Sequence, residues 1–367
     1  MRWMLAPLLL TGCPGGGTVR DSEAETASDT ALPDRCPDVP WTQIATGAQL
    51  SCGLKEDGCV TCWGDIEYAI DRRLDGCAGR DTGCDFENFH EDDPPAVVAV
   101  QVALSKEWVD STNLGSFSGC LLGLDGVPTC WGRNDRGQAG PRGTVLLSVG
   151  VDFLTGGGLT PDGTVTLWGE AAVPPTLPAP ATHLAYAAGF DDLCWIAGGE
   201  AGCFSALSGE EFFRSSDRFS PAPEVVDIDA HGLNSWEQRE ACVVDVTGSL
   251  HCIDWADAVA VDAWPLPPVP FAITEFCFAL DGLRACALDA NGLPECWGIN
   301  PARDVQMDTT EARALGLPLH GLECGLGHAC ALTAAGEAVC WGDNMAGQSA
   351  PPGSYVLARG SGEVEPM

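Results

Sequence analysis

The chain has 367 residues, of which 45% are hydrophobic and 19% are charged, and this composition excludes a disordered chain. It carries 52 acidic and 18 basic residues, giving a formal net charge of −34, which disfavours partners rich in phosphate, such as nucleic acids and anionic lipid headgroups. The 45 glycines and 26 prolines suit many short strands joined by turns better than they suit helices.

The first thirteen residues have the outline of an export signal. Arg2 precedes a short apolar run, too short to span a bilayer, that ends in Leu-Thr-Gly-Cys at residues 10–13. This ending resembles the bacterial lipobox, in which signal cleavage leaves the cysteine acylated at the new N-terminus. We therefore expect residues 1–13 to be a lipoprotein signal peptide with lipidation at Cys13. An ordinary signal peptide or a mis-assigned start codon is the alternative.

Residues 14–40 follow as a segment rich in Gly, Thr, Ser, Ala, Asp and Glu, with few side chains that can pack. A flexible tether at this place would hold a domain away from a membrane. We expect a bacterial cell-envelope protein, lipid-anchored to the outer membrane or cell surface, with no other membrane contact. In that oxidising compartment the 19 cysteines are expected to form disulfides.

One unit recurs seven times from residue 41 onward. Its clearest copy runs from Gly327 to Gly342, and the copies start near residues 41, 96, 143, 181, 223, 269 and 318. The spacing of 38 to 55 residues suits a four-stranded propeller blade. We therefore predict an all-β fold over residues 41–360, a closed seven-bladed β-propeller of four-stranded blades, followed by a tail at 361–367. Residues 355–360 resemble the strand that begins another copy, and they could pair with a terminal blade and close the ring.

Each copy contains a hairpin signal with a glycine at a fixed place. A three-residue hairpin loop needs φ > 0 at its third residue, which glycine reaches without steric cost. The glycines at this place are Gly58, Gly126, Gly163, Gly248, Gly292 and Gly336. The remaining copy is one residue shorter and has Gly198-Gly199 at its turn.

The same register places two cysteines of a copy opposite each other, within the distance that a disulfide tolerates. In the third copy both positions change together, to Gly157 and Leu167, as expected for paired cysteines. The predicted cross-hairpin disulfides are Cys52–Cys62, Cys120–Cys130, Cys194–Cys203, Cys242–Cys252, Cys286–Cys296 and Cys330–Cys340. The alternative is six pairs of reduced, buried cysteines acting as small apolar residues.

The other cysteines are assigned from their places in the chain. Cys77 and Cys84 lie together in an acidic insertion and are expected to bridge locally. Cys277 and Cys324 precede the last two hairpins at similar places, which indicates a bridge between blades. By elimination the last pair is Cys36–Cys59.

The repeat resembles the regulator of chromosome condensation repeat family, whose pattern runs Gly, His, a short apolar strand, a Gly turn, Val, Trp-Gly, Asn and Gly-Gln. The last copy carries Gly325, His328, Leu332, Gly336, Val339, Trp341, Gly342, Asn344, Gly347 and Gln348, and the second carries Trp131, Gly132, Asn134, Gly137 and Gln138. The resemblance covers roughly residues 41–360 and implies a seven-bladed propeller. The cysteine-flanked form is similar to repeats of bacterial secreted and lipid-anchored proteins.

The nucleotide-exchange activity of the family's founder is not carried over, because the compartment and charge differ and no exchange residues match. The sequence has no Gly-x-Ser-x-Gly, no His-Glu-x-x-His and no phosphate-binding loop, so we expect no enzyme and no cofactor. We expect His328 to be a hydrogen-bonded structural histidine. The tryptophans that recur at one repeat position are expected to pack between blades: Trp63, Trp131, Trp168, Trp297 and Trp341.

Three features could hold a metal ion, and for each a solvated or structural role is the preferred interpretation. His90 begins an acidic cluster beside two prolines. Asp227 begins a segment that resembles a calcium loop, but its twelfth position is Gln238 rather than Glu. Cys59 and Cys62 form a C-x-x-C without the second half of a zinc site. We expect no metal.

The expected function is that of a non-enzymatic envelope lipoprotein, a monomer that binds or scaffolds a protein partner and no nucleic acid. Two alternatives stay open: an envelope lyase or hydrolase with a site in the central channel, and a passive structural protein of the cell surface. The long, unequal segments 65–95 and 204–222 favour binding, since repeat proteins place binding surfaces on such insertions.

Overall fold

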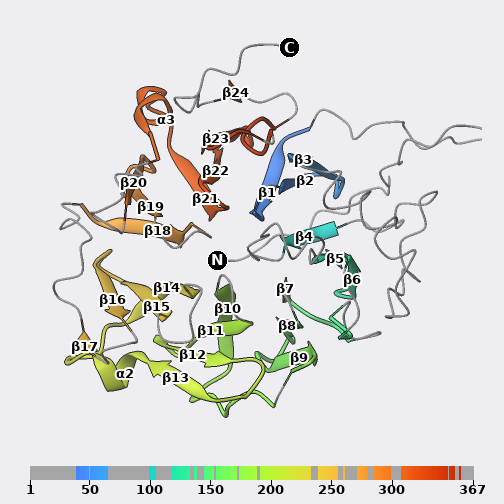
Figure 1. Ribbon diagram of the computed structural model, residues 1–367, viewed down its shortest axis with the longest axis vertical. Helices are drawn as coiled ribbons and strands as arrows, with labels where there is room; N and C mark the ends of the chain where they lie inside the picture. Colours follow the sequence, from blue (N-terminus) through green and yellow to red (C-terminus); the bar gives the residue numbers. More distant parts are fainter. Residues whose placement is uncertain are drawn as a thin grey trace, which may run out of the picture.

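The computed structural model describes residues 39–48, 50–64, 99–104, 118–132, 136–138, 144–152, 154–171, 173–187, 191–232, 239–254, 259–260, 271–279, 284–298, 307–345, 347–351 and 355–356. Within these residues the fold is all-β, with seven separate sheets of three or four strands and two short helices. Figure 1 shows the sheets arranged around a common centre, one strand of each sheet lying innermost. Each sheet begins within about five residues of a predicted repeat start.

The innermost strands are β1 (Trp41–Thr46), β4 (Ala99–Leu104), β7 (Ser148–Val151), β10 (Ala181–Ala187), β14 (Val225–Gly232), β18 (Ile273–Phe278) and β21 (Leu319–Cys324). The second strands are β2 (Leu50–Lys55), β5 (Ser118–Gly123), β8 (Thr155–Leu159), β11 (Asp192–Ala197), β15 (Arg239–Asp245), β19 (Arg284–Asp289) and β22 (His328–Thr333). The third strands are β3 (Val60–Gly64), β6 (Pro128–Gly132), β9 (Val165–Gly169), β12 (Glu200–Ser205), β16 (Leu250–Asp254), β20 (Pro294–Gly298) and β23 (Ala338–Gly342). Consecutive strands within these triplets pair antiparallel.

A fourth strand is described in three sheets: β13 (Glu211–Arg214), β17 (Val259–Ala260) and β24 (Tyr355–Val356). The prediction of four strands in every blade is wrong for the third sheet, since the described residues 173–180 after β9 contain no strand. The segment 204–222, interpreted from the sequence as a loop, instead forms the end of β12, β13 and the short helix α2 (Ser215–Arg218). The other helix, α3 (Thr310–Ala314), precedes β21.

The strand predicted after the last hairpin is present as β24, which pairs in parallel with β23 and so extends the last sheet. The first and last sheets meet in another way, since β1 packs against β21 and β22.

The predicted hairpin glycines adopt the left-handed conformation. Their φ values are 86° for Gly58, 74° for Gly126, 80° for Gly163, 80° for Gly248, 74° for Gly292 and 75° for Gly336. In the shorter copy Gly198 and Gly199 both have positive φ, 62° and 80°, as a two-residue hairpin turn requires.

These glycines also join neighbouring sheets, which the sequence analysis did not anticipate. The carbonyl oxygen of each tip glycine accepts a hydrogen bond from the amide of a residue at, or two residues before, the start of the next inner strand. The seven bonds in the described residues are Gly58–Ala99 (3.2 Å), Gly126–Leu146 (2.7 Å), Gly163–Ala181 (2.9 Å), Gly199–Val225 (2.8 Å), Gly248–Ile273 (2.8 Å), Gly292–Leu319 (2.9 Å) and Gly336–Trp41 (2.8 Å). The last of them links the seventh sheet to the first.

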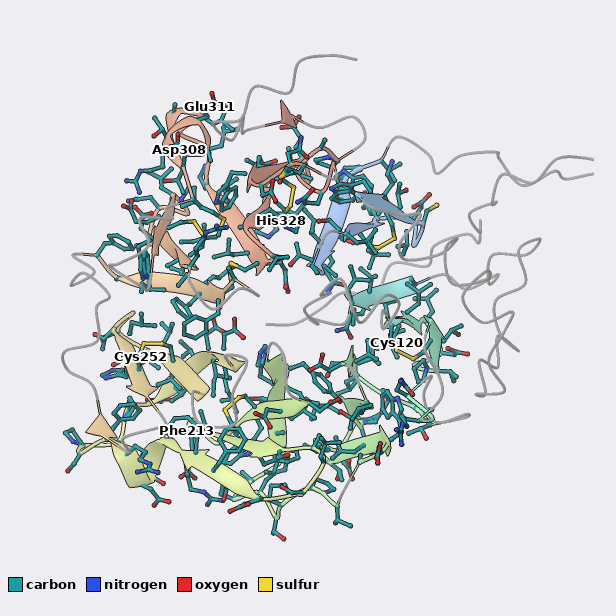
Figure 2. All side chains as sticks on the ribbon, in the orientation of Figure 1. Cys120, Phe213, Cys252, Asp308, Glu311 and His328 are labelled. Atoms are coloured by element: carbon teal, nitrogen blue, oxygen red, sulfur yellow. A yellow bond between two sulfur atoms is a disulfide. The ribbon has the colours of Figure 1, made fainter. Side chains whose placement is uncertain are left out.

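All six cross-hairpin disulfides are present, and their Cα–Cα distances lie between 4.0 and 4.1 Å. In each pair the two cysteines face one another in the strand register, as Cys120 and Cys130 do on β5 and β6. Figure 2 shows these sulfur–sulfur bonds within separate sheets, for example at Cys120 and at Cys252. The bridge between the last two inner strands is also formed, with Cys277 and Cys324 Cα atoms 5.7 Å apart.

The hydrophobic core is divided into layers between neighbouring sheets. Phe276 and Trp297 of the sixth sheet share one layer with Val244 of the fifth. Trp41 and Trp63 of the first sheet share another with the last sheet, whose residues there are Cys330, Leu332, Ala338 and Cys340. Each sheet therefore buries both faces against its neighbours, which explains why the second strands are apolar without alternation.

Candidate functional site

The inner strands are joined by side chains at one repeat position, the residue that follows a β-bulge at the start of the strand. On β1, Gln43 Nε2 donates to the carbonyl oxygen of Val102 at 3.1 Å, and its Oε1 accepts from the amide of Val102 at 3.0 Å. On β4, Gln101 forms the same two bonds with Val149, both at 2.9 Å. Each amide thus acts as one more rung of backbone pairing between separate sheets.

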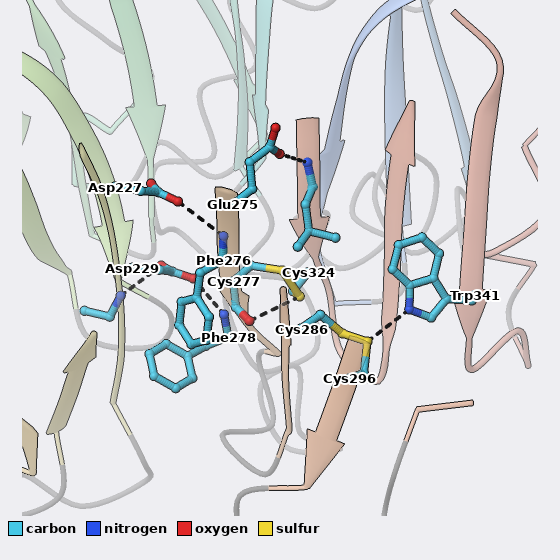
Figure 3. The surroundings of a disulfide bond; sticks show 12 residues. Asp227, Asp229, Glu275, Phe276, Cys277, Phe278, Cys286, Cys296, Cys324 and Trp341 are labelled. Atoms are coloured by element: carbon cyan, nitrogen blue, oxygen red, sulfur yellow. Dashed lines mark hydrogen bonds between the residues drawn. A yellow bond between two sulfur atoms is a disulfide. The ribbon is translucent and has the colours of Figure 1, made fainter. Parts of the chain in front are cut away.

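Carboxylates occupy the same position in two later sheets, after the same bulge. The amide of Phe276 donates to Asp227 Oδ2 at 3.2 Å, and the amide of Leu322 donates to Glu275 Oε2 at 2.7 Å. Asp229, two residues further along β14, accepts from the amide of Phe278 at 2.8 Å. Figure 3 shows these carboxylates reaching from one inner strand to the next beside the Cys277–Cys324 disulfide.

Burial and the nearby charge of Asp229 raise the pKa of Asp227 to about 7. A strongly raised carboxyl pKa is a known mark of catalytic residues. Here each of these carboxyls accepts a hydrogen bond from the neighbouring strand, which accounts for its position without a substrate. Asp227, the first residue of the calcium-like segment, lies within β14, and residues 233–238 fall outside the described residues.

The recurring tryptophans join each sheet to the one before it. Trp63 Nε1 donates to the carbonyl oxygen of Gln348 at 2.9 Å, and Trp168 Nε1 donates to that of Gln138 at 3.1 Å. Trp341 Nε1 lies 3.2 Å from Cys296 Sγ on the preceding sheet. Together with the buried Trp297, they pack between sheets as predicted, while the Trp131 side chain lies outside the described part. The Gly-Gln segment of the repeat therefore supplies an acceptor for the next repeat's indole.

His328 is the structural histidine that the sequence predicted. Its side chain is fully buried on β22, and its Nε2 is 2.9 Å from Ser51 Oγ on the first sheet. Ser51 Oγ also donates to the carbonyl oxygen of Gln348 at 3.1 Å. Burial lowers the pKa of His328 to about 4, so the ring is neutral at physiological pH. Figure 2 shows His328 on the side of its sheet that faces β1.

The third repeat, which lacks the cysteine pair, is filled from the next sheet. A Cβ on Gly157 would lie 3.0 Å from the Tyr186 hydroxyl, and one on Gly150 would lie 2.5 Å from the Tyr186 ring. Just before β11, Asp191 has φ of 53° and its Oδ1 accepts three bonds of 2.8 Å, from the amides of Leu154 and Thr155 and from the Thr155 hydroxyl. A tyrosine and a buried aspartate here join the third and fourth sheets.

Two of the surface cavities of the described part of the chain bear on the search for a site. The larger, about 570 Å³, lies between the sixth and seventh sheets and is lined by Glu275, Asp289, Asn291 and His320, among others. The smaller, about 260 Å³, lies beside β13 and α2. Among the described residues no group of three or more His, Cys, Asp or Glu is placed to hold a metal ion. No helix of that part is long and apolar enough to cross a membrane.

Several predicted residues lie outside the described part: the lipidation site Cys13, the cysteines Cys36, Cys77 and Cys84, and the acidic cluster at residues 90–93. Cys59 takes part in a disulfide, and every described cysteine is disulfide-bonded.

The seven-sheet arrangement defines a propeller-like, all-β protein. The regulator of chromosome condensation (RCC1) repeat matches residues 41–66 and 321–348. The first and last repeats are therefore RCC1 repeats, and the repeat family predicted from the sequence is confirmed. No curated protein sequence matches this chain significantly.

Solved structures resemble the chain in fold. The CRINKLY WD40 ectodomain of the Arabidopsis thaliana receptor kinase ACR4 is 17% identical, with 83% of this chain and 97% of that chain covered and a TM-score of 0.52. Human WBSCR16 is 12% identical, with 85% and 94% covered and a TM-score of 0.54. Prp20p of Saccharomyces cerevisiae is 13% identical, with 77% and 80% covered and a TM-score of 0.50. At such identities the likeness concerns the fold alone.

Proposed function

We propose that the chain is a closed seven-bladed propeller that acts as a protein-binding scaffold without enzymatic activity. Closure is supported by the contacts between the last sheet and the first, which repeat those at the other junctions. The Gly336–Trp41 backbone bond and the Trp63–Gln348 bond are the counterparts of bonds between consecutive sheets. His328 and Ser51 add a buried pair at that junction.

The observation that carries the binding role is how the polar groups near the centre are used. The amide and carboxyl side chains of the inner strands bond to the backbone of the next strand, as Gln43, Gln101, Asp227 and Glu275 do. Side chains bonded in this way hold neighbouring strands together. We therefore place partner recognition on the outer surface of the ring. The likeness to Prp20p, which was solved together with a study of its binding to Gsp1p and histones, supports a protein partner.

We propose a location in the bacterial cell envelope, on the basis of the expected anchor at Cys13 and of the disulfides. A lipoprotein signal ending at Cys13 would send the chain to the bacterial envelope and fix it there by acylation. Disulfide bonding of the described cysteines supports an oxidising compartment. Incorporation of labelled palmitate into the wild type, with none into Cys13→Ser, is the expected result. Equal labelling of both would show that Cys13 is not the lipidation site.

The binding role is tested by capturing the mature protein from a cross-linked envelope fraction, beside a variant that lacks residues 65–95. A stoichiometric protein partner is expected, and its loss with the deletion would assign binding to that insertion. If no protein is enriched by either form, the scaffold role is wrong.

A further inference from the structure

The seven hairpin tips lie on one face of the molecule. Each tip glycine is bonded to the start of the next inner strand, and each inner strand starts beside the tip of its own sheet. The tips and strand starts therefore form one continuous surface, which we call the hairpin face. Its tips are residues 56–58, 124–126, 161–163, 198–199, 246–248, 290–292 and 334–336, and its strand starts are 40–42, 99–100, 145–147, 180–182, 224–226, 272–274 and 318–320.

Large apolar side chains are exposed on the hairpin face at equivalent positions of different repeats. The last residue of the strand start is Val100 in the second sheet, Leu147 in the third and Val226 in the fifth. The first residue of the tip is Leu124 in the second sheet and Val246 in the fifth. These five side chains are between 46% and 63% exposed. Exposed apolar groups that gather on one surface mark an interaction site.

Four of the exposed side chains are close together across the second and third sheets. Val100 follows Ala99 on β4, Ala99 is paired with Gly123 at the end of β5, and Leu124 follows Gly123 in the tip between β5 and β6. Val145 lies against that tip, because a Cβ on Gly126 would be 2.9 Å from Val145 Cγ1. Leu147 follows two residues later. We call these four residues, Val100, Leu124, Val145 and Leu147, the apolar patch.

The hairpin face carries a net negative charge. Its tips and strand starts contain Glu56, Asp57, Asp125, Asp162 and Glu224, and no lysine or arginine. The neighbouring Lys55 is largely buried, with its Nζ 4.8 Å from the centre of the Trp41 ring. Asp125 directly follows Leu124 of the apolar patch. Hydrogen bonds from Thr160 and Thr164 lower the pKa of Asp162, which keeps that tip negatively charged. Such a surface repels acidic partners and attracts a segment that carries Lys or Arg beside its apolar residues.

The larger cavity opens on the same face and has the same character. It lies between the tip at 290–292 and the strand start at 318–320, and Glu275 and Asp289 are among its lining residues. Among the described residues that line it there is neither lysine nor arginine. Leu315 and Leu317, both exposed, precede that strand start. Exposed apolar groups again stand next to carboxyls.

We propose that the hairpin face docks a basic, amphipathic segment of a protein partner. The segment's apolar side chains would cover the apolar patch, and its lysines or arginines would lie beside the carboxylates of the tips. The inference rests on the proposed scaffold function and adds to it the face and the chemistry of the partner.

The test measures the affinity of the full mature protein for an amphipathic Leu/Lys peptide of about 18 residues, against a peptide of the same composition in scrambled order. The variant Leu124→Ser/Leu147→Ser removes two side chains of the apolar patch. The control Val173→Ser/Met345→Ser removes two that are 84% and 90% exposed and lie outside the hairpin face. We expect the amphipathic peptide to bind at least about tenfold tighter than the scrambled one, and the patch variant to lose about tenfold in affinity. The control should change less than about twofold.

Equal binding of both peptides, or equal losses in both variants, would show attraction by net charge alone and overturn the proposal. A photo-crosslinking residue placed at Leu147 or at Met345 separates this failure from failure of the scaffold role. A partner captured only through position 345 overturns the hairpin face while the scaffold role stands. A partner captured through position 147 by a basic segment supports both.

Discussion

The tip glycines are needed for two reasons: the turn requires a positive φ, and the next inner strand passes too close for a Cβ. Gly292 has φ of 74°, and a Cβ there would lie 2.6 Å from the amide nitrogen of Leu319 and 2.7 Å from its carbonyl oxygen. Gly316 also has positive φ, 63°, but a Cβ there would meet no atom within 4 Å. The two positions separate the cost of the backbone conformation from the cost of crowding the next strand.

We therefore expect Gly316→Ala to destabilise the protein by about 1 kcal/mol, the cost of the left-handed conformation alone. Gly292→Ala should cost about 3 kcal/mol, because the added methyl also pushes against the backbone of β21. Urea unfolding of both variants beside the wild type measures the difference. Equal losses would mean that the tip tolerates a Cβ and that the contact with β21 is unimportant.

The hairpins were predictable from the sequence because their determinants are local. The two facing cysteines lie nine or ten residues apart with the tip glycine between them, so spacing alone fixes their register. The close contact between Gly292 and Leu319 was not predictable, since these residues meet only when the sixth and seventh sheets pack together. The same holds for Gln43, whose partner Val102 is 59 residues away.

The buried carboxyl of Asp227 gives a pH dependence of known sign. Its pKa is raised to about 7 in the folded state, from about 3.9 in an unfolded chain. The folded state therefore holds this proton more tightly, and stability falls as pH rises from about 4 through 7. His328, whose pKa is lowered to about 4, acts in the opposite direction, since its contribution is lost as pH falls below about 6.5.

Comparison of the wild type with Asp227→Asn isolates the effect of the Asp227 carboxyl on stability, because His328 is present in both proteins. The variant should gain stability relative to the wild type between about pH 4.5 and about pH 8, by on the order of 1 to 4 kcal/mol. Urea unfolding at the two pH values gives the difference. If the gap between variant and wild type is the same at both, Asp227 does not titrate in that range.

At the level of elements, amides and carboxylates join inner strands in different ways at the same repeat position. Gln43 both accepts from and donates to the backbone of Val102, whereas a carboxylate such as Glu275 only accepts. The carboxylate also adds charge beside Asp227 and so contributes to the raised pKa there. An amide should hold the next strand better than a carboxylate of the same length.

A reciprocal exchange tests this point. Glu275→Gln is expected to stabilise the protein by about 1 kcal/mol, since it gains a donor and loses a repulsion. Gln43→Glu should destabilise it by about 1 to 3 kcal/mol, because the carbonyl of Val102 loses its donor. Midpoints of urea unfolding report both changes. Changes of the same sign would show that the side-chain length, and not the hydrogen-bond pattern, matters at this position.

The element count shows where sequence reasoning reaches its limit. The periodic glycine lies between the second and third strands of every repeat, and most repeats add the facing cysteines and a tryptophan on these strands, so the hairpins were predictable. The fourth strand carries no such signal, and its described forms differ: β13 follows a short turn, β24 pairs in parallel, and residues 173–180 form none. Edge strands contact one neighbour only, so sequence constrains them least.

For the whole molecule, the decisive question is how the two ends of the repeat array are held together. Stability in an open array of repeats is a sum over neighbouring units, and its ends fray independently. In this chain the first and last sheets share a core layer, a backbone bond and the buried His328–Ser51 pair. A disturbance at that junction should therefore loosen both ends at once.

Matched tryptophan variants test closure. Trp63→Phe removes the indole bond to Gln348 between the first and last sheets, and Trp168→Phe removes the equivalent bond to Gln138 between consecutive sheets. Each should cost about 1 to 2 kcal/mol. In hydrogen exchange, Trp63→Phe should loosen β1–β3 and β21–β23 together, although almost the whole chain separates them. Trp168→Phe should speed exchange in the second and third sheets only. These two sheets are consecutive in the chain, so this result is expected whether or not the ring is closed. Faster exchange of β1–β3 with β21–β23 unchanged would mean that the ends are not coupled and that the ring is open.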